Sequence, residues 1–232
     1  MIDLNNRADI ATNKLNRVFK HNNAPVLKLD IEYPVVLLPH GSGVQTRINL
    51  HYKNYARNFY RYAELTMLPA AIEQYEAAKK DGNPFNVYEA VMTYCVTLNG
   101  DCRMSAFADK YEYTGGAHGS TTRSSNTWDL QNGNHVKMVN LFGTDTRYRK
   151  TVIRKIQAEA EKSAAENPDI YFDNYRQLIE DNFNSQSFFL TPKNLNVYYQ
   201  QYDIAPYSTG IVVFELPYES LGIERPRCMQ EC

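Results

Sequence analysis

Apolar residues repeat with two different periods along this chain, and the order of these patterns limits its fold more than any other feature. Residues 27–33 alternate apolar with charged side chains, which indicates a half-buried strand that Pro34 is expected to end. Residues 46–80 instead carry an apolar stripe at the period of a helix, and Pro69 is expected to break or kink it. A strand is therefore predicted to lead into a long helix.

The remaining patterns indicate a mixture of hairpins and inserted helices. The residues on either side of Asn99-Gly100, 88–98 and 101–113, are predicted to form a long hairpin. Further strands are expected at 120–129, 135–139, 187–190, 194–199 and 210–216, and helices at 147–165 and 175–183. This order lacks the strict alternation of a parallel sheet. We expect an α+β fold, in which two longer helices and one short helix pack on a twisted, mostly antiparallel sheet.

The charge balance excludes some classes of function. The chain has 25 Lys plus Arg and 26 Asp plus Glu, a formal net charge of −1, whereas nucleic-acid and anionic-membrane binders need a surplus of cations. No run of about 18 apolar residues is present, so no membrane span is expected in the chain. The first residues do not resemble a signal peptide. The protein is thus expected to be cytoplasmic, unless a leader or anchor has been removed.

The four cysteines form two pairs in the sequence, Cys95 with Cys102 and Cys228 with Cys232. A two-residue turn at Asn99-Gly100 would leave Cys95 two residues out of register with Cys102, which argues against a bridge across the hairpin. Whether either pair forms a disulfide stays open. The Cys and His residues do not recur at the spacing of a zinc site, so no metal and no other cofactor are expected.

The most distinctive stretch is Tyr-Thr-Gly-Gly-Ala-His-Gly at 113–119. It precedes Trp-Asp-Leu at 128–130, Asn132-Gly133 and Leu-Phe at 141–142, and Pro-Tyr pairs follow at 206–207 and 217–218. This series resembles a bacterial domain family of unknown function, found in the C-terminal sensor region of the lysozyme-sensing anti-sigma-V factor. Residues 26–112 resemble, by the order of their elements, the companion domain that usually precedes it.

The resemblance implies the domain limits and a compartment. We expect an N-terminal arm at 1–25, a companion α+β half at 26–113, a sensor-like half at 114–222 that shares a core with the first, and a C-terminal tail at 223–232. Family members occur in extracytoplasmic sensors and beside cell-wall polysaccharide deacetylases. The resemblance therefore implies an extracytoplasmic binding domain whose partner is a lysozyme-like protein or a peptidoglycan fragment.

The loop at 113–119 supplies the first candidate site. Gly115 and Gly116 permit positive φ angles, so they either form a tight turn or a turn that binds a ligand. His118 is interpreted first as a buried imidazole that ties the loop to neighbouring backbone. It could also bind a ligand, and if the protein is an enzyme it is the candidate general base.

The second candidate is a tyrosine-rich segment formed by Tyr198, Tyr199, Tyr202, Pro206 and Tyr207. Tyrosine offers a flat apolar ring with a polar end, which suits recognition of proteins or sugars. Neighbouring residues on a strand point to opposite faces, so at least one of the first two tyrosines is expected to face away from the core. The other interpretation is that these rings only seal the edge of the sheet.

Three classes of function follow. The preferred hypothesis is a non-catalytic binding domain for a lysozyme-type protein or a cell-wall glycan, because no catalytic set of residues is recognisable. The alternatives are a hydrolase that acts on a cell-wall substrate through His118, and a structural or assembly domain.

Overall fold

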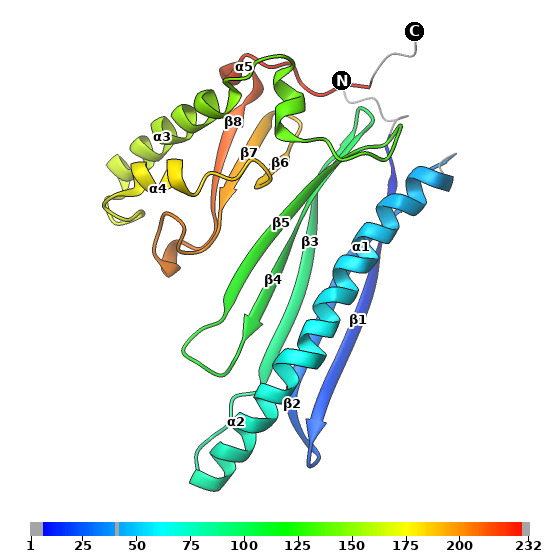
Figure 1. The fold of residues 1–232 in the computed structure, drawn as a ribbon, viewed down its shortest axis with the longest axis vertical. Coiled ribbons are helices and arrows are strands. Elements are labelled where there is room, and N and C mark those ends of the chain that lie inside the picture. Colours follow the sequence, from blue (N-terminus) through cyan, green and yellow to red (C-terminus); the bar gives the residue numbers. More distant parts are fainter. Residues whose placement is uncertain (1–6, 40–41, 229–232) are drawn as a thin grey trace. The chain divides into compact units, whose positions relative to one another are not determined.

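The computed structural model describes residues 7–39 and 42–228 and shows eight strands in two sheets together with helices (Figure 1). The larger sheet has the strand order β1-β2-β3-β4-β5, and the smaller sheet has the order β6-β7-β8. The predicted α+β class is confirmed. The strands are divided between two sheets, whereas the sequence patterns were interpreted as a single sheet.

The chain begins with a hairpin that the sequence patterns did not reveal. Strands β1 (Asp9–His21) and β2 (Ala24–Leu37) pair antiparallel through a two-residue loop, Asn22-Asn23, whose φ angles of 49° and 65° are those of a type I′ turn. Within β1 only Phe19 is buried. Its side chains therefore lack the alternation by which a strand is recognised.

Pro34 does not end β2, contrary to the prediction. It pairs in register with Thr12 of β1, and β2 continues to Leu37. The parallel pairing of β2 with β3 (Tyr88–Gly100) extends only from Leu27 to Ile31. Beyond that point β2 has a neighbour on one side, and such an edge position tolerates a residue without an N–H group.

The long helix forms as predicted but is not broken at Pro69. Helix α1 (Ser42–Tyr62) leads through a π-helical turn, η2 (Ala63–Met67), into α2 (Leu68–Asp81), which ends at Gly82 in the left-handed conformation. The N–H of Leu68 bonds to the carbonyl of Ala63, five residues back. The wider turn thus comes immediately before the residue that has no N–H to donate. The apolar stripe of α1 packs on β2.

The predicted turn of the next hairpin is displaced by two residues. Strand β4 (Arg103–Tyr113) is joined to β3 by Asp101 and Cys102, whose φ angles are 52° and 57°. Asn99 stays in β3, where its side chain accepts from the N–H of Ala8 and donates to the carbonyl of Ala8, at 3.0 and 2.8 Å. These tertiary bonds place the Asn-Gly pair inside the strand and outweigh its preference for turns.

The C-terminal strands and two of the helices lie close to their predicted limits, with one exception. The elements are β5 (Ser120–Asp129), η3 (Met138–Phe142), α3 (Tyr148–Glu166), α4 (Tyr175–Asp181), β6 (Phe188–Leu190), β7 (Asn194–Tyr199), η4 (Tyr207–Thr209), β8 (Val212–Pro217) and α5 (Tyr218–Leu221). The helices α3 and α4 are the predicted ones, and the short helices η3, η4 and α5 were not predicted. The strand predicted at 135–139 is wrong. It is reduced to a single bridge between His135 and Trp128, after which the chain enters the 3-10 helix η3.

The chain divides into two compact units, which are described separately below. Unit 2 contains the described residues of Asp9–Tyr94 and Ala108–Thr122, and unit 1 contains Arg7, Ala8, Cys95–Phe107 and the described residues from Arg123 onward. In unit 2, β1, β2 and β3 carry α1 along one side (Figure 1). In unit 1, α3 packs on β8 and α4 on α3. The domain limits expected from the sequence stay a prediction.

Hydroxyl groups bond to the backbone of β6 inside unit 1. The buried Ser105 hydroxyl of β4 accepts from the N–H of Leu190 at 2.9 Å, and Thr97 of β3 donates to the carbonyl of Leu190 at 2.7 Å. Ser125 of β5 donates to the carbonyl of Phe188. Side chains thus satisfy backbone groups of β6 that no neighbouring strand would reach, and they hold β6 beside the ends of β3, β4 and β5.

Candidate binding sites

The glycine-rich loop between β4 and β5 lies in unit 2, and two of its glycines are needed for packing. A Cβ atom at Gly115, whose φ is 83°, would lie 2.8 Å from Oε1 of Gln74, and one at Gly119 would lie 2.3 Å from the ring of Tyr111. A Cβ atom at Gly116 would meet nothing within 4 Å. The close approach of α2 and of the Tyr111 ring therefore accounts for the glycines at 115 and 119.

His118 lies exposed on this loop, so the prediction of a buried imidazole is wrong. Its Nδ1 atom is 3.1 Å from the carbonyl oxygen of Gly119, the next residue along the chain. Packing at Gly115 and Gly119 fixes the loop conformation. In this conformation the imidazole of His118 lies at the surface. The proposed ligand-binding and catalytic roles of His118 stay predictions.

Tyr198 and Tyr199 are both buried, with exposed fractions of 3% and 2%, so the prediction that one of them faces outward is wrong. They do point to opposite faces of β7, but both faces are covered. The Tyr199 hydroxyl donates to the carbonyl of Ile179 at 2.8 Å. Burial raises the pKa of the Tyr199 phenol. The Tyr198 ring stacks on Phe189, and the guanidinium of Arg123 lies 5.9 Å from its centre.

The other three residues of the tyrosine-rich segment lie at the surface of unit 1. Tyr202 is 55% exposed, and its ring centre is 6.0 Å from that of Tyr207, with 34° between the ring planes. Pro206 is half-buried beside Tyr207. We refer to Tyr202, Pro206 and Tyr207 as the tyrosine platform.

Tyr202 has a backbone conformation that is unusual for a bulky residue. The N–H of Asp203 bonds to the carbonyl of Gln200 at 3.1 Å, which closes a four-residue turn, and Tyr202 is its third residue with a φ of 67°. Since the φ of Gln201 is not positive, the turn is of type II, in which the third residue is usually glycine. Tyrosine in this position costs about 1–2 kcal/mol.

The surrounding contacts hold this turn in place. The carboxylate of Asp203 accepts from the N–H of Gln200 at 2.7 Å, and burial raises the pKa of Asp203. Asn182 donates to the carbonyl of Asp203 at 2.7 Å. The Gln200 side chain donates to the carbonyl of Arg123 and accepts from its N–H, at 2.7 and 2.9 Å. A strained conformation persists where its surroundings impose it in this way.

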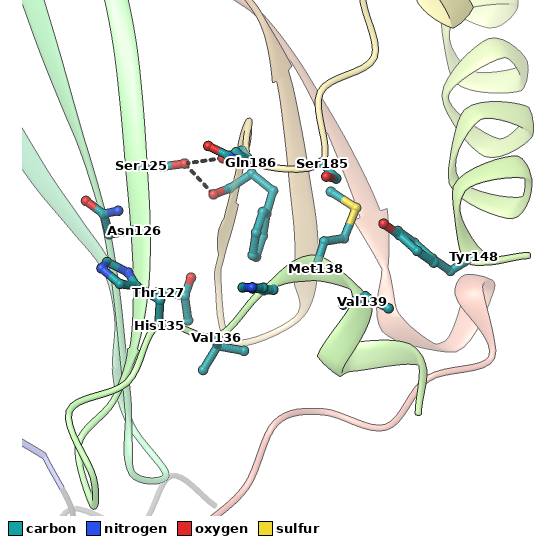
Figure 2. A pocket seen from close by; sticks show the side chains of 12 residues that line it. Ser125, Asn126, Thr127, His135, Val136, Met138, Val139, Tyr148, Ser185 and Gln186 are labelled. Carbon is teal, nitrogen blue, oxygen red and sulfur yellow. Dashed lines mark hydrogen bonds between the residues drawn. The ribbon is translucent and has the colours of Figure 1, made fainter. Parts of the chain in front are cut away.

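A second site in unit 1 was not found from the sequence. A pocket of about 390 Å³, which we call the β5–β6 pocket, lies between β5, η3, the start of α3 and the segment that leads into β6 (Figure 2). It is lined by Ser125, Asn126, Thr127, His135, Val136, Lys137, Met138, Val139, Tyr148, Ser185, Gln186 and Phe188. These residues come from four separate segments, three of them between residues 125 and 148 and the fourth at 185–188, so no local motif indicated the pocket.

Ring packing and hydrogen bonds hold one wall of the β5–β6 pocket. The His135 ring packs on Trp128, the only tryptophan of the chain, with ring centres 3.8 Å apart. The hydroxyl of Thr127 bonds at 2.8 Å to that of Ser105, and Ser125 bonds to backbone carbonyls of the segment entering β6. These hydroxyls are already committed to structural bonds.

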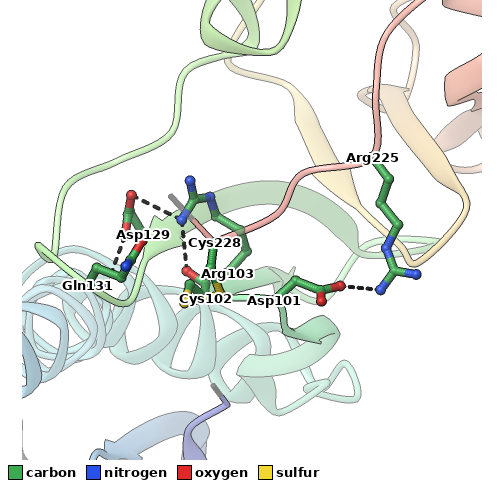
Figure 3. Close-up of a disulfide and its surroundings, with 7 residues drawn as sticks. All are labelled: Asp101, Cys102, Arg103, Asp129, Gln131, Arg225 and Cys228. Carbon is green, nitrogen blue, oxygen red and sulfur yellow. Dashed lines mark hydrogen bonds and ion pairs between the residues drawn. A yellow bond between two sulfur atoms is a disulfide. The ribbon is translucent and has the colours of Figure 1, made fainter. Parts of the chain in front are cut away.

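The cysteine pairing differs from both pairs suggested by the sequence. Cys102, in the β3–β4 turn, forms a disulfide with Cys228, with the two Cα atoms 4.9 Å apart (Figure 3). Cys95 is an exposed free thiol, and Cys232 lies outside the described residues. The tail is also tied by an ion pair between Arg225 and Asp101. Sequence spacing could not show this bond because it joins residues 126 positions apart.

A buried ion pair lies beside the disulfide. Nη1 of Arg103 is 3.0 Å from Oδ2 of Asp129, and both side chains are nearly inaccessible to solvent. The same guanidinium donates to the carbonyl of Cys102, and Asp129 accepts from the N–H of Gln131 at 2.8 Å (Figure 3). Both charges therefore have several partners, as buried charges require. Across the residues that the structure describes, no group of three His, Cys, Asp or Glu side chains could hold a metal ion.

Comparison with known proteins adds the family context. Residues 20–121 match the family model described as deacetylase PdaC, and residues 139–219 match DUF3298, a family of unknown function. The loop at 113–119 falls within the first match. No curated protein matches the chain.

Two solved structures share the fold. A member of the DUF3298 family from Bacteroides fragilis is 19% identical, with a TM-score of 0.73 and 94% of each chain covered. A DUF3298 family protein from Pseudomonas aeruginosa is 17% identical, with a TM-score of 0.61, and 94% of this chain and 95% of that chain are covered. The resemblance found in the motifs is thus confirmed, because a match to the PdaC model precedes a match to the DUF3298 model along the chain and solved DUF3298 structures share the fold.

Proposed function

We propose that this chain is a non-catalytic binding domain that recognises a cell-wall glycan at the tyrosine platform. The observation that carries this proposal is Tyr202, a bulky aromatic residue that is strained and 55% exposed. Glycine would adopt the positive φ of this turn position with less strain than tyrosine. An exposed ring kept at such a position is accounted for if its function is to contact a ligand.

The size of the platform favours a sugar over a protein. Among the large apolar side chains described as exposed, only Val139 and Tyr202 belong to unit 1. A stable protein interface buries about 800 Å² on each partner around a cluster of apolar or aromatic anchors. Two tilted tyrosine rings with centres 6.0 Å apart instead offer apolar area for one or two sugar rings.

Two further observations support a role at the cell wall. The Cys102–Cys228 disulfide is the kind of bond that persists in oxidising compartments, which supports an extracytoplasmic location. The PdaC model that matches residues 20–121 is named for a deacetylase. Within the described residues, the helices are too short or too polar to span a membrane.

The test is a calorimetric titration of the whole chain with soluble peptidoglycan fragments and with chitin oligosaccharides. We expect binding that Tyr202→Gly reduces at least tenfold. The same substitution should leave the unfolding free energy unchanged or raise it by up to about 1 kcal/mol, because relief of left-handed strain offsets the extra entropy of unfolded glycine. Tyr62→Ala, which removes a 40% exposed tyrosine from unit 2, serves as the matched control and should not change glycan binding.

Other outcomes would favour the other functions. Binding of a lysozyme instead of glycan would identify the domain as a protein sensor of the anti-sigma type. Release of acetate or of reducing ends that disappears in a folded His118→Ala variant would identify a hydrolase. A stable oligomer in light scattering that binds neither class would indicate an assembly domain. Each of these results, or glycan binding that Tyr202→Gly does not weaken, would contradict the proposal.

A further inference from the structure

We propose that the β5–β6 pocket binds the carboxylate end of a small molecule or short peptide that also carries an apolar group. This site shares no residue with the tyrosine platform, and its occupation does not depend on glycan binding. The pocket volume of about 390 Å³ lies in the range of small-molecule sites.

The charge of the lining points to an anion. Lys137 is one of the twelve lining residues, and none of the twelve is Asp or Glu. The side chain of Lys137 forms no ion pair with a described residue. An incoming carboxylate would therefore meet a cation that no lining carboxylate neutralises.

The rest of the lining fits an apolar group that carries some polar atoms. Four apolar side chains contribute to the wall, namely those of Val136, Met138, Val139 and Phe188. The side chains of Tyr148, Ser185 and Gln186 also line the pocket (Figure 2), and these side chains form no hydrogen bond to another described residue; the bond from Ser125 goes to the backbone carbonyl of Gln186. These three groups can thus bond to amide or hydroxyl groups of a ligand without breaking an existing bond.

The hydroxyls of β5 that line the pocket are fixed by existing bonds. Ser125 and Thr127 are held by bonds to the segment entering β6 and to Ser105. A preformed site loses less free energy when a ligand orders it. This part of the pocket wall therefore need not rearrange when a ligand binds.

Trp128 provides a direct measurement, because it is the only tryptophan and its ring contacts His135 in the pocket wall. We would titrate the full chain with N-acetyl-alanyl-alanine, with its C-terminal amide and with N-acetyl-phenylalanine, and follow tryptophan fluorescence, with calorimetry as a second readout. The two acids should bind, and the amide should bind about tenfold more weakly, as for loss of a charge-assisted bond. Binding of the acids should weaken as salt is raised.

Lys137→Gln should reduce the affinity for the acids about tenfold and leave the affinity for the amide unchanged. Lys150→Gln is the matched control, since Lys150 is an exposed lysine of α3 that does not line the pocket, and it should bind as wild type does. Equal affinity for acid and amide, no effect of Lys137→Gln, or no binding of either acid by both methods would overturn the inference. Tyr202→Gly should leave this binding unchanged, which separates the test from that of the tyrosine platform.

Discussion

Removal of the Cys102–Cys228 disulfide is expected to destabilise unit 1 by several kcal/mol. The bond closes a loop between residues 126 positions apart. In the chain-entropy model, such a loop restricts the unfolded chain by roughly 16 cal/mol/K, or about 5 kcal/mol at 25 °C. Measured values for native disulfides are usually about 2–5 kcal/mol. Loss of the bond also frees the tail that carries the ion pair between Arg225 and Asp101.

The assay is urea unfolding followed by the fluorescence of Trp128, which lies in the same unit as both cysteines. Reduced wild type and the variant Cys228→Ser should both unfold at lower urea than the oxidised protein, with a loss of about 2–5 kcal/mol in the free energy of unfolding. The dependence of the unfolding free energy on urea should become steeper, because an unfolded chain without the cross-link exposes more surface. Cys95→Ser, which replaces the exposed free thiol, is the control and should unfold as wild type does.

Two results would refute this reasoning. A loss below about 1 kcal/mol on reduction would mean that the loop is already restricted in the unfolded state or that the bond does not form. A Cys228→Ser variant that is much less stable than reduced wild type would mean that the cysteine side chain contributes packing that the entropy model omits. Mass spectrometry of the non-reduced protein after proteolysis shows directly which cysteines are joined.

Three further substitutions test the packing of the two units. Asp129→Asn should cost about 3 kcal/mol because it leaves the buried charge of Arg103 without its counter-ion, and a urea midpoint within error of wild type would contradict this. Ser105→Ala should cost about 1–3 kcal/mol in the same assay because a backbone N–H of β6 is left without an acceptor, whereas a neutral result would mean that water replaces the hydroxyl. Gly119→Ala should destabilise unit 2, since its Cβ atom would lie 2.3 Å from the ring of Tyr111. Adding Tyr111→Ala to Gly119→Ala should restore stability. If the two substitutions instead lower the free energy of unfolding additively, the two residues do not clash.

The predictions from the sequence were best where the signal was local. The periods of the long helix, of β3 and of the C-terminal strands indicated these elements to within a few residues, because a half-buried element shows its buried face directly in the sequence. The motifs were also sufficient to identify the family resemblance. Strand β1 was missed because only one of its side chains is buried, so its pairing with β2 leaves no pattern in its own residues.

Tertiary contacts decided what local patterns could not. The Asn99-Gly100 pair favours a turn, but two bonds to Ala8 hold Asn99 in the strand and move the turn to Asp101 and Cys102. Alternation along β7 was predicted correctly for Tyr198 and Tyr199, yet the sequence could not show that both faces of the strand are covered.

The sequence by itself therefore determined the class of the fold, the family resemblance and most of the helices and strands, since each depends on residues that are close together in the chain. The tertiary structure alone decided the disulfide, the β5–β6 pocket and which tyrosines remain exposed. Each of these depends on residues that are far apart in sequence and meet only after folding. A single sequence records no such distances, which is the physical reason why the candidate sites had to be found in the structure.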